Sequence, residues 1–333
     1  MNHQLKYLLD LLKHAKEEMV RMKVIDTHCD ALLKLQQGMR QGLTLNYRNE
    51  QTIETNLNRL RKGNVKIQFY AIFIDPEIPS DEKWQHALEQ IDLFYSEIIG
   101  KNPDIKQIKN WEDIAKLKER EIGAVLTLEG ADAFGNSLVK LRHLYRMGVL
   151  SIGLTWNNAN LCADGVGEPR GSGLTLLGKE VVKLNNENRI WTDVSHLSVN
   201  SFWDVMELAD YPFASHSNAR AICDHPRNLT NDQIEAMFNK NGLIQLVFNP
   251  PFINEQKQTA TISDLITHID HLCALGGEKQ IGFGSDFDGI TSFVKDLENA
   301  SKYPVLINEL LKHYNEEQVR GFAYENFIAN LPK

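Results

Sequence analysis

The sequence predicts an α/β protein, a (β/α)8 TIM barrel of the metal-dependent hydrolase type, with an N-terminal helical extension. Short apolar segments alternate with longer amphipathic ones, which is the pattern of strands and helices around a parallel sheet. About eight such pairs follow one another, and 333 residues suit one barrel with some inserted loops. Residue types that bind metals also stand where the strands are expected to end.

Eight strands are expected along the chain. Each is a short apolar run that polar or turn-forming residues bound. The ranges are 23–28, 65–74, 122–129, 149–155, 190–195, 212–215, 242–248 and 280–286. A doubly wound open sheet is the alternative, and it normally carries a glycine-rich phosphate turn after its first strand. Here the first strand leads into "DTHCDAL", which has no glycine, so the barrel is favoured.

Amphipathic helices are expected between these strands, because apolar residues recur there every three or four positions. The segment "NEQTIETNLNRLRKG" (49–63) ends at Gly63, a residue type that often terminates helices. The other helical segments are 81–99, 136–148, 175–188, 198–209, 230–242 and 261–277. No low-complexity segment, obvious repeat or long Gly/Ser linker interrupts this alternation. Residues 1–333 are therefore expected to form a single barrel domain.

Residues 1–22 predict an amphipathic helix that packs on the body of the barrel. Leu5, Leu8 and Leu12 fall at helical spacing, and charges interrupt any apolar core, so the segment does not resemble a signal peptide. A membrane-surface helix is the weaker alternative, because acidic residues share the polar face. No apolar run approaches the roughly 18 residues that a membrane span needs. The final "NLPK" carries no lipid-anchor signal, and we expect no membrane partner.

Charge and cysteine content narrow the class of protein. A net charge of −8 without a dense Lys/Arg cluster argues against a nucleic-acid partner, because phosphate contact needs a basic face. A disulfide framework is not expected in a chain this long with four scattered cysteines and no CxxC pair. We therefore expect a reduced, cytoplasmic setting. The cysteines are Cys29, Cys162, Cys223 and Cys273.

Polar residues gather at the expected strand ends, where the active sites of such barrels lie. The candidates are His28 and Asp30 after the first strand, Glu129 at the end of the third, His196 and His216 after the fifth and sixth, and Asp286 and Asp288 after the eighth. The strands were placed by hydrophobicity, and the polar residues then fell at their ends. Three histidines and several carboxylates are thus predicted on one rim.

Imidazole nitrogen and carboxylate oxygen together suit Zn²⁺ and related divalent metals. Five candidate ligands exceed what one tetrahedral zinc needs, whereas two metals that share a carboxylate would use them all. Such pairs sit about 3.5–4 Å apart and hold an activated hydroxide. Cys29, between His28 and Asp30, is expected to point into the barrel wall, because strand side chains alternate.

Each candidate taken alone has a simpler structural interpretation. A lone His28 at a strand end is more often a hydrogen-bonded structural residue. Glu129 before a glycine could cap the following helix, and "GSDFDG" could be an Asp-rich turn. The joint placement of five ligand-type residues at strand ends is what favours a metal site.

Five motifs occur in a fixed order along the chain: "DTHCD", "LTLEGAD", "DVSH", "SHSNARAICDHPRN" and "IGFGSDFDG". In this combination the chain, from about Val24 to its end, resembles the membrane dipeptidase (renal dipeptidase) family, peptidase family M19 of the amidohydrolase superfamily. The resemblance implies a (β/α)8 barrel that hydrolyses dipeptides at a binuclear zinc centre, by a hydroxide that bridges the two ions. It also implies tolerance of a C-terminal D-residue, and some members open β-lactams.

The resemblance also implies roles for individual residues. The implied set is His28 and Asp30 on one zinc, Glu129 bridging both, His196 and His216 on the other, Asp286 as the acid/base that carries the proton, Arg227 gripping the substrate carboxylate, and Asp288 orienting the site or binding the substrate amine. A planar guanidinium suits a carboxylate, although a surface salt bridge is the ordinary interpretation of an arginine. A homodimer is implied as well.

One stretch departs from the family pattern. The best-known members have a histidine after "LT" at the end of the fourth strand, and it helps to polarise the scissile carbonyl. This chain has Trp156 there, followed by Asn157, Asn158 and Asn160. An asparagine amide, of which Asn158 is the candidate, could donate a hydrogen bond to the oxyanion. The departure bears on substrate preference and rate more than on metal binding.

Two other functions remain open. Another binuclear-metal amidohydrolase, such as a lactonase, phosphotriesterase-like enzyme, β-lactam hydrolase or other amide hydrolase, would keep the metals and change the substrate, because fold does not fix function. Arg227 discriminates this case, since only a carboxylate substrate needs it. A non-catalytic metal-binding homologue is the third possibility, and Asp286 counts against it.

Overall fold

The computed structural model describes residues 22–255 and 259–333, so the predicted N-terminal helix lies outside the described residues. Nine strands occur in the described ranges. They are β1 (Val24–Asp26), β2 (Val65–Phe73), β3 (Ile105–Gln107), β4 (Ile122–Glu129), β5 (Val149–Gly153), β6 (Trp191–Asp193), β7 (Pro212–Ala214), β8 (Leu243–Leu246) and β9 (Ile281–Phe283). All eight expected strands are therefore present, and β3 is an additional one.

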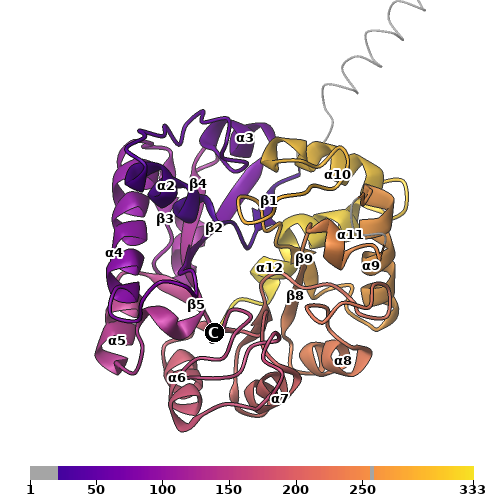
Figure 1. Ribbon diagram of the computed structural model, residues 1–333. Coiled ribbons are helices and arrows are strands. Elements are labelled where there is room, and N and C mark those ends of the chain that lie inside the picture. Colours follow the sequence, from indigo (N-terminus) through magenta and orange to yellow (C-terminus); the bar gives the residue numbers. More distant parts are fainter. Residues whose placement is uncertain (1–21, 256–258) are drawn as a thin grey trace, which may run out of the picture.

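The strands form one closed parallel barrel. Their order is β2-β1-β9-β8-β7-β6-β5-β4-β3, and a pairing of β2 with β4 closes the sheet. Eight strands make the barrel wall, and β3 is an addition at its edge. In Figure 1 the strands lie in the middle of the molecule and the helices surround them. The predicted (β/α)8 barrel is confirmed.

Helices follow the strands as the amphipathic pattern predicts. The bounds are α2 (Ala31–Arg40), α3 (Leu57–Lys62), α4 (Lys83–Leu93), α5 (Leu138–Arg146), α6 (Leu176–Glu187), α7 (Val199–Leu208), α8 (Asn231–Asn239), α9 (Ile262–Ala274), α10 (Tyr303–Leu310), α11 (Glu316–Arg320) and α12 (Asn326–Ala329). A π-helical segment, Phe94–Gly100, extends α4, and another, Gly321–Glu325, joins α11 to α12. Short 3-10 turns occur at Trp111–Lys116, Ala131–Ala133, Pro250–Phe252 and Ala300–Lys302.

Side-chain caps explain where several helices begin. Thr175, Ser198 and Thr230 each accept a hydrogen bond from a backbone N–H in the first turn of α6, α7 or α8. The predicted helix over 49–63 differs from the structure, because only its last part is helical. Asn56 caps α3, and the backbone N–H groups just before it, at residues 54 and 55, donate to a distant carboxylate instead of joining a helix.

Strand β4 has neighbours on both edges along its whole length. One edge pairs with β2 from Gly123 to Glu129. The other edge pairs first with β3, from Ile122 to Ala124, and then with β5, from Leu126 to Glu129. The sequence pattern missed β3, because a run of three residues is too short for alternation to mark it.

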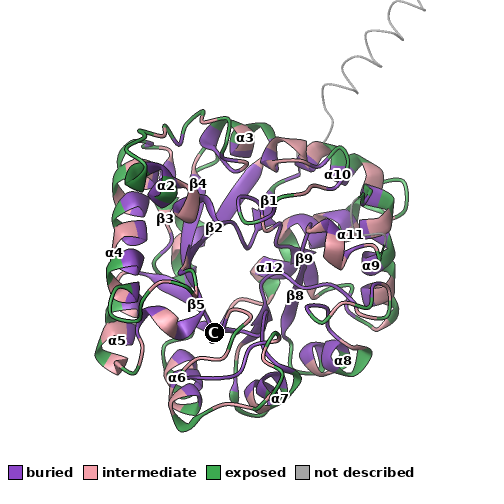
Figure 2. Ribbon diagram, in the orientation of Figure 1, coloured by how far each residue is buried: buried purple, intermediate pink, exposed green. Residues whose placement is uncertain are grey.

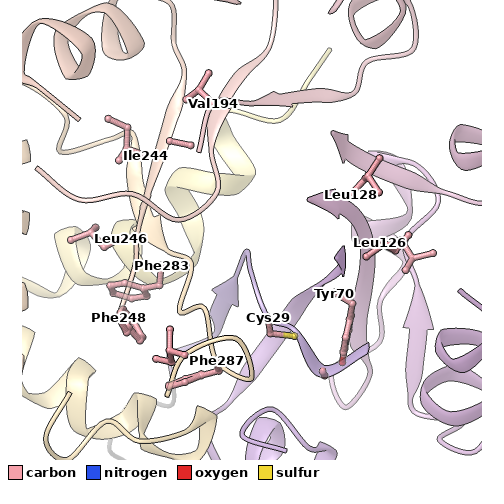
Figure 3. Packing of buried hydrophobic residues seen from close by; sticks show 14 of the residues in the cluster. Cys29, Tyr70, Leu126, Leu128, Val194, Ile244, Leu246, Phe248, Phe283 and Phe287 are labelled. Carbon is pink, nitrogen blue, oxygen red and sulfur yellow. The ribbon is translucent and has the colours of Figure 1, made fainter. Parts of the chain in front are cut away.

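The apolar core has two parts. The larger lies between the barrel wall and the helices, whose inward faces are buried while their outer faces are exposed (Figure 2). Figure 3 shows Cys29 in this cluster with Tyr70 of β2. The smaller part contains side chains from β1, β2 and β4–β8, and Phe327 of α12 packs on it. Among its rings, the centroids of Trp191 and Phe213 are 5.0 Å apart.

This smaller cluster contains residues from the first halves of the strands, such as Ile67 and Val125, so it fills the N-terminal end of the barrel. The carboxyl ends of β1, β4 and β6 carry the buried carboxylates of Asp26, Glu129 and Asp193, and the buried His28, His196 and His216 follow β1, β6 and β7. Chemistry is therefore confined to one end of the barrel. No helix in the described part of the chain combines the length and the apolar character needed to cross a membrane.

Candidate metal centre

Glu129 stands in the middle of the site, at the end of β4. Its Oε2 lies 3.3 Å from Nε2 of His28, which follows β1. Its Oε1 lies 2.9 Å from Nε2 of His196, after β6, and 3.8 Å from Nε2 of His216, after β7. One carboxylate thus faces histidines from opposite parts of the barrel wall, one with each oxygen.

Two groups of donor atoms overlap at His28. One contains His28, Glu129 and His216, and the other contains His28, Asp30 and Asp286, with the donor atoms of each group all within 4.8 Å of one another. Nε2 of His28 is 3.5 Å from Oδ2 of Asp30 and 3.9 Å from Oδ1 of Asp286. The structure therefore brings together all five predicted ligands and the predicted acid/base. Cys29 belongs to neither group.

The hydrogen bonds of two rings fix which nitrogen is free. Nδ1 of His196 lies 2.7 Å from Oδ1 of Asn157, an oxygen that can only accept, so Nδ1 carries the proton. Nδ1 of His216 lies 2.7 Å from the hydroxyl oxygen of Ser215, which donates its own proton to Asp193. Both rings therefore direct an unprotonated Nε2 toward Glu129.

These free nitrogens fit a cation. Nε2 of His196 and Nε2 of His216 are only 2.8 Å apart, and two lone pairs at that distance repel each other unless a positive centre lies beside them. Nε2 of His28 is buried and has no hydrogen-bond partner among the described residues. The polar atoms nearest to it are the carboxylate oxygens of Glu129 and Asp30, at 3.3 and 3.5 Å. This donor set, three imidazoles with carboxylates, is the set that binds zinc and similar ions.

Burial and charge shape the ionisation of the centre. Burial lowers the pKa of His196 to about 4, and burial with nearby positive groups holds the pKa of His216 well below its usual range. Burial opposes the ionisation of Glu129, but the charge of His28 favours it and holds the pKa of Glu129 well below its usual value. Burial lowers the pKa of His28, yet Glu129 and Asp30 raise it well above normal.

Asp286 has the opposite tendency. Burial raises the pKa of this carboxyl well above its usual range, and the neighbouring charges of Asp30 and Glu129 add to that effect, against His28 and Arg227. A carboxyl that holds its proton more readily is suited to general acid–base work. Its backbone φ of 64° and that of His196, 70°, lie in the left-handed region, which Asp and His adopt more readily than most other non-glycine residues.

Gly289 allows two carboxylates to approach each other. A Cβ at this position would lie 2.3 Å from Oδ2 of Asp30 and 2.7 Å from Oδ1 of Asp286. Any other residue would push these side chains apart. Gly289 is the last residue of the motif "GSDFDG". A glycine at the end of this Asp-rich motif is the sequence signal that could have indicated a close approach of the backbone to these carboxylates.

A pocket of about 190 Å³ opens beside Glu129, Asp30 and Asp286. Its apolar wall contains Leu33, Phe73, Trp156 and Phe252. Trp156 packs edge-on against Phe73 at 5.4 Å between ring centroids, and its ring lies 6.0 Å from that of His196. The indole that departs from the family pattern therefore forms part of the wall next to a predicted ligand.

Arg227 also lines this pocket. Its side chain is buried, and its Nη2 donates to the carbonyl of His216 at 3.4 Å. Its Nε has no hydrogen-bond partner within residues 22–255 and 259–333. The guanidinium lies over the ring of Phe252 at 5.6 Å. Burial lowers its pKa to about 10, so it stays cationic at neutral pH. No carboxylate of the described residues forms an ion pair with it, which suits it to an anionic ligand.

Two predicted substrate contacts lie outside the pocket lining. The carboxylate of Asp288 accepts from the backbone N–H of Glu54 at 2.7 Å and of Thr55 at 3.2 Å, and Lys34 lies 3.4 Å away. Asp288 therefore anchors the segment before α3. Asn158 is exposed, whereas its neighbour Asn157 lines the pocket and bonds His196. The contact of Asn157 with His196 is not predicted from the sequence.

Comparison with known proteins agrees with this geometry. The family model for the membrane dipeptidases, peptidase family M19, matches residues 12–332. An uncharacterized dipeptidase of Schizosaccharomyces pombe is 32% identical over 341 residues, which cover 96% of this chain and 80% of that protein.

Two crystal structures share the fold over nearly their whole length. A metallopeptidase of Rhodobacter sphaeroides, liganded with a phosphinate mimic of the dipeptide L-Ala-D-Ala, has a TM-score of 0.87 and 25% identity, and the match covers 93% of this chain and 98% of that one. Dipeptidase AC, a metallopeptidase of family M19, has a TM-score of 0.86, 25% identity and the same coverage.

Proposed function

Because the chain belongs to the membrane dipeptidase family, peptidase family M19, we propose that it hydrolyses dipeptides with two divalent metal ions per chain, zinc being the first candidate. The observation that carries this proposal is the position of Glu129 between His28 on one side and His196 and His216 on the other. A carboxylate with one oxygen toward each set can serve two ions at once.

The residues divide into two halves around Glu129. His28 and Asp30 would hold one ion, His196 and His216 would hold the other, and Glu129 would contact both. When bound, such ions lower the pKa of water toward neutrality and polarise the carbonyl that is attacked. The free Nε2 atoms of His196 and His216 and the ionised Glu129 support this division.

Asp286 is the proposed proton carrier. It lines the pocket, and its carboxyl lies next to His28 and Asp30. In this role it accepts the proton of the attacking water and passes it to the amine of the leaving residue. Its raised pKa supports the role, because such a carboxylate is the stronger base toward the attacking water and keeps the proton for transfer in the second step.

Arg227 is the proposed contact for the free carboxylate of the substrate. It is a buried cation without a carboxylate partner among the described residues, and it lines the same pocket as Asp286. The ligand of the Rhodobacter sphaeroides enzyme mimics L-Ala-D-Ala, so L-D dipeptides belong among the first substrates to test. Asp288 and Asn158 are left out of the substrate site, because neither lines the pocket.

The test uses purified protein loaded with zinc and a panel of L-L and L-D dipeptides. We expect two zinc ions per chain by elemental analysis and cleavage of at least part of the panel. If two ions are bound and no dipeptide is cleaved, the dipeptidase proposal is wrong. Cleavage of lactones or phosphotriesters instead would identify another hydrolase on the same barrel.

Arg227→Ala tests the carboxylate contact. We expect KM for a dipeptide to rise about 10- to 100-fold, which corresponds to the loss of one charged hydrogen-bond pair of about 1.5–3 kcal/mol. The amide of the same dipeptide, which has no carboxylate, should be a poor substrate that the substitution leaves unchanged. Arg227→Lys, which keeps the charge without the planar fork, is the matched control. Equal effects on both substrates would contradict the proposed contact.

A further inference from the structure

We propose that Asp193 and Ser215 are a positioning pair that sets the ring of His216 for metal binding. Neither residue belongs to the predicted ligand set. The inference rests on the proposed function, because it assigns His216 to one of the two ions. It concerns how the chain holds this ligand, not which ligand it is.

Asp193 is the acceptor in each of its hydrogen bonds. Its Oδ1 accepts the backbone N–H of Ser195 at 2.9 Å and that of Ser215 at 3.0 Å. Its Oδ2 accepts the hydroxyl proton of Ser215. Three donors thus converge on one carboxylate, and together they fix the end of β6 against the end of β7.

Ser215 transmits this arrangement to the ring. A hydroxyl has one proton, and that of Ser215 is used by Asp193, so its oxygen can only accept from Nδ1 of His216 at 2.7 Å. The ring is then protonated at Nδ1 and free at Nε2. The backbone N–H of His216 donates to Ser195 at 3.1 Å, which holds the residue from a second side.

Burial makes the arrangement hard to replace. Asp193, Ser215 and His216 are 6%, 2% and 1% exposed. Solvent water therefore has little access to Nδ1, and a lost hydroxyl would leave that N–H unpaired. An indirect partner of a metal-binding histidine commonly determines its tautomer and orientation, and its loss typically costs 10–100-fold in metal affinity.

The chain contains a natural control for this proposal. At the end of β1, Asp26 accepts the backbone N–H of Ser285 at 2.9 Å and its hydroxyl at 2.7 Å. Ser285 precedes Asp286 as Ser215 precedes His216, but among the described contacts its hydroxyl has no histidine ring. Removing the Ser285 hydroxyl therefore weakens a strand-end contact of the same kind without touching a ligand's ring nitrogen.

The experiment compares Ser215→Ala with Ser285→Ala in the full chain. ¹⁵N spectra of the metal-free protein, assigned by comparison with a His216→Gln variant, report which nitrogen of His216 is protonated. Zinc affinity is measured by competition with a chelator. For Ser215→Ala we expect the Nδ1–H form to lose its dominance and one of the two ions to bind about 10- to 100-fold more weakly. For Ser285→Ala we expect the parent's His216 spectrum.

Two further variants make the outcome decisive. Ser215→Thr keeps the hydroxyl and should restore both the spectrum and the affinity. Asp193→Asn should shift the tautomer as well, and if it does not fold, Ser215→Ala alone decides. An unchanged His216 spectrum and unchanged affinity of both ions in Ser215→Ala would overturn the proposal. A parent that binds two ions but cleaves no dipeptide would contradict only the proposed function.

Discussion

At two corners of the barrel rim the same pattern of hydrogen bonds has different roles. At the β1/β9 corner Asp26 pairs in register with Phe283 and accepts two hydrogen bonds from Ser285, two residues further on. At the β6/β7 corner Asp193 pairs with Phe213 and accepts two from Ser215, again two residues further on. In each case a serine stands directly before a residue of the site.

The difference lies in what the serine does next. Ser215 contacts the ring of the ligand that follows it, whereas Ser285 contacts the backbone carbonyl of His28 at 3.3 Å. The β6/β7 corner thus orients a side chain, and the β1/β9 corner holds only the backbone around one. An aspartate–serine contact between strand ends can therefore serve only to hold two strands together. It becomes part of a site when the side chain of the residue after the serine can reach the serine hydroxyl.

Replacing Glu129, which contacts histidines at both corners, should have the largest effect on metal binding and activity. Glu129→Ala removes the carboxylate that faces His28 on one side and His196 on the other. We expect both ions to be lost and the rate of dipeptide cleavage to fall by more than about 100-fold. This loss exceeds the one usually seen when a residue that only hydrogen-bonds to a metal ligand is replaced. Elemental analysis and initial rates measure the two effects. Two ions per chain in this variant would show that Glu129 is not shared.

A smaller, one-sided effect is expected from Gly289→Ala. The added methyl group would meet Asp30 and Asp286 at the β1/β9 corner. We expect about a 10- to 100-fold loss of activity and the loss of the ion held by His28 and Asp30, while the other ion stays. Gly123→Ala adds a methyl group at the start of β4, where it meets the side chains of Leu117 and Ile108 at 3.0 and 3.2 Å, and is the control. If Gly289→Ala releases both ions equally, the two corners are not independent.

The smallest effect concerns stability on the β7 side. His268 of α9 accepts the backbone N–H of Ala219 through Nδ1 at 3.2 Å, and burial lowers its pKa to about 4. Between pH 6.5 and about 4 the unfolded chain binds a proton that the folded chain resists. This contribution is therefore complete above pH 6.5 and is lost as the pH falls, by about 3 kcal/mol at most.

Urea unfolding at a series of pH values measures this loss. In His268→Gln the fall in the free energy of unfolding between pH 6.5 and about 4 should be smaller than in the parent. His271→Gln, on the same helix, should keep the parent's fall. An identical pH dependence in the parent and His268→Gln would contradict the assignment.

Much of the barrel, and the meeting of the proposed ligands at one rim, could be predicted, because both depend on local patterns. Hydrophobic runs marked the eight barrel strands, and parallel strands in a closed barrel bring His28, Glu129 and His216 to one rim without any further information. The β3 strand was missed because it is too short to show a pattern. The helix over 49–63 was predicted too long because Asp288, far along the chain, takes the N–H groups of residues 54 and 55.

The supporting residues could not be assigned from one sequence for the same reason. Asp193 and Ser215 become partners only through the register of β6 with β7. Asn157 and Asn158 are adjacent, and the choice between them depends on which amide reaches His196. Which residue of a loop reaches the site depends on the path of the loop. Hydrophobic periodicity contains no information about that path.

The double pairing of β4 has a consequence for the reaction itself. Glu129 ends the strand that β2 holds along one edge and β3 and β5 hold along the other. A carboxylate carried on so firmly held a backbone needs little rearrangement as charge moves between substrate and water. In the proposed reaction its charge is already in place before the bond breaks, so the energy that water would spend on reorientation is not required at that step.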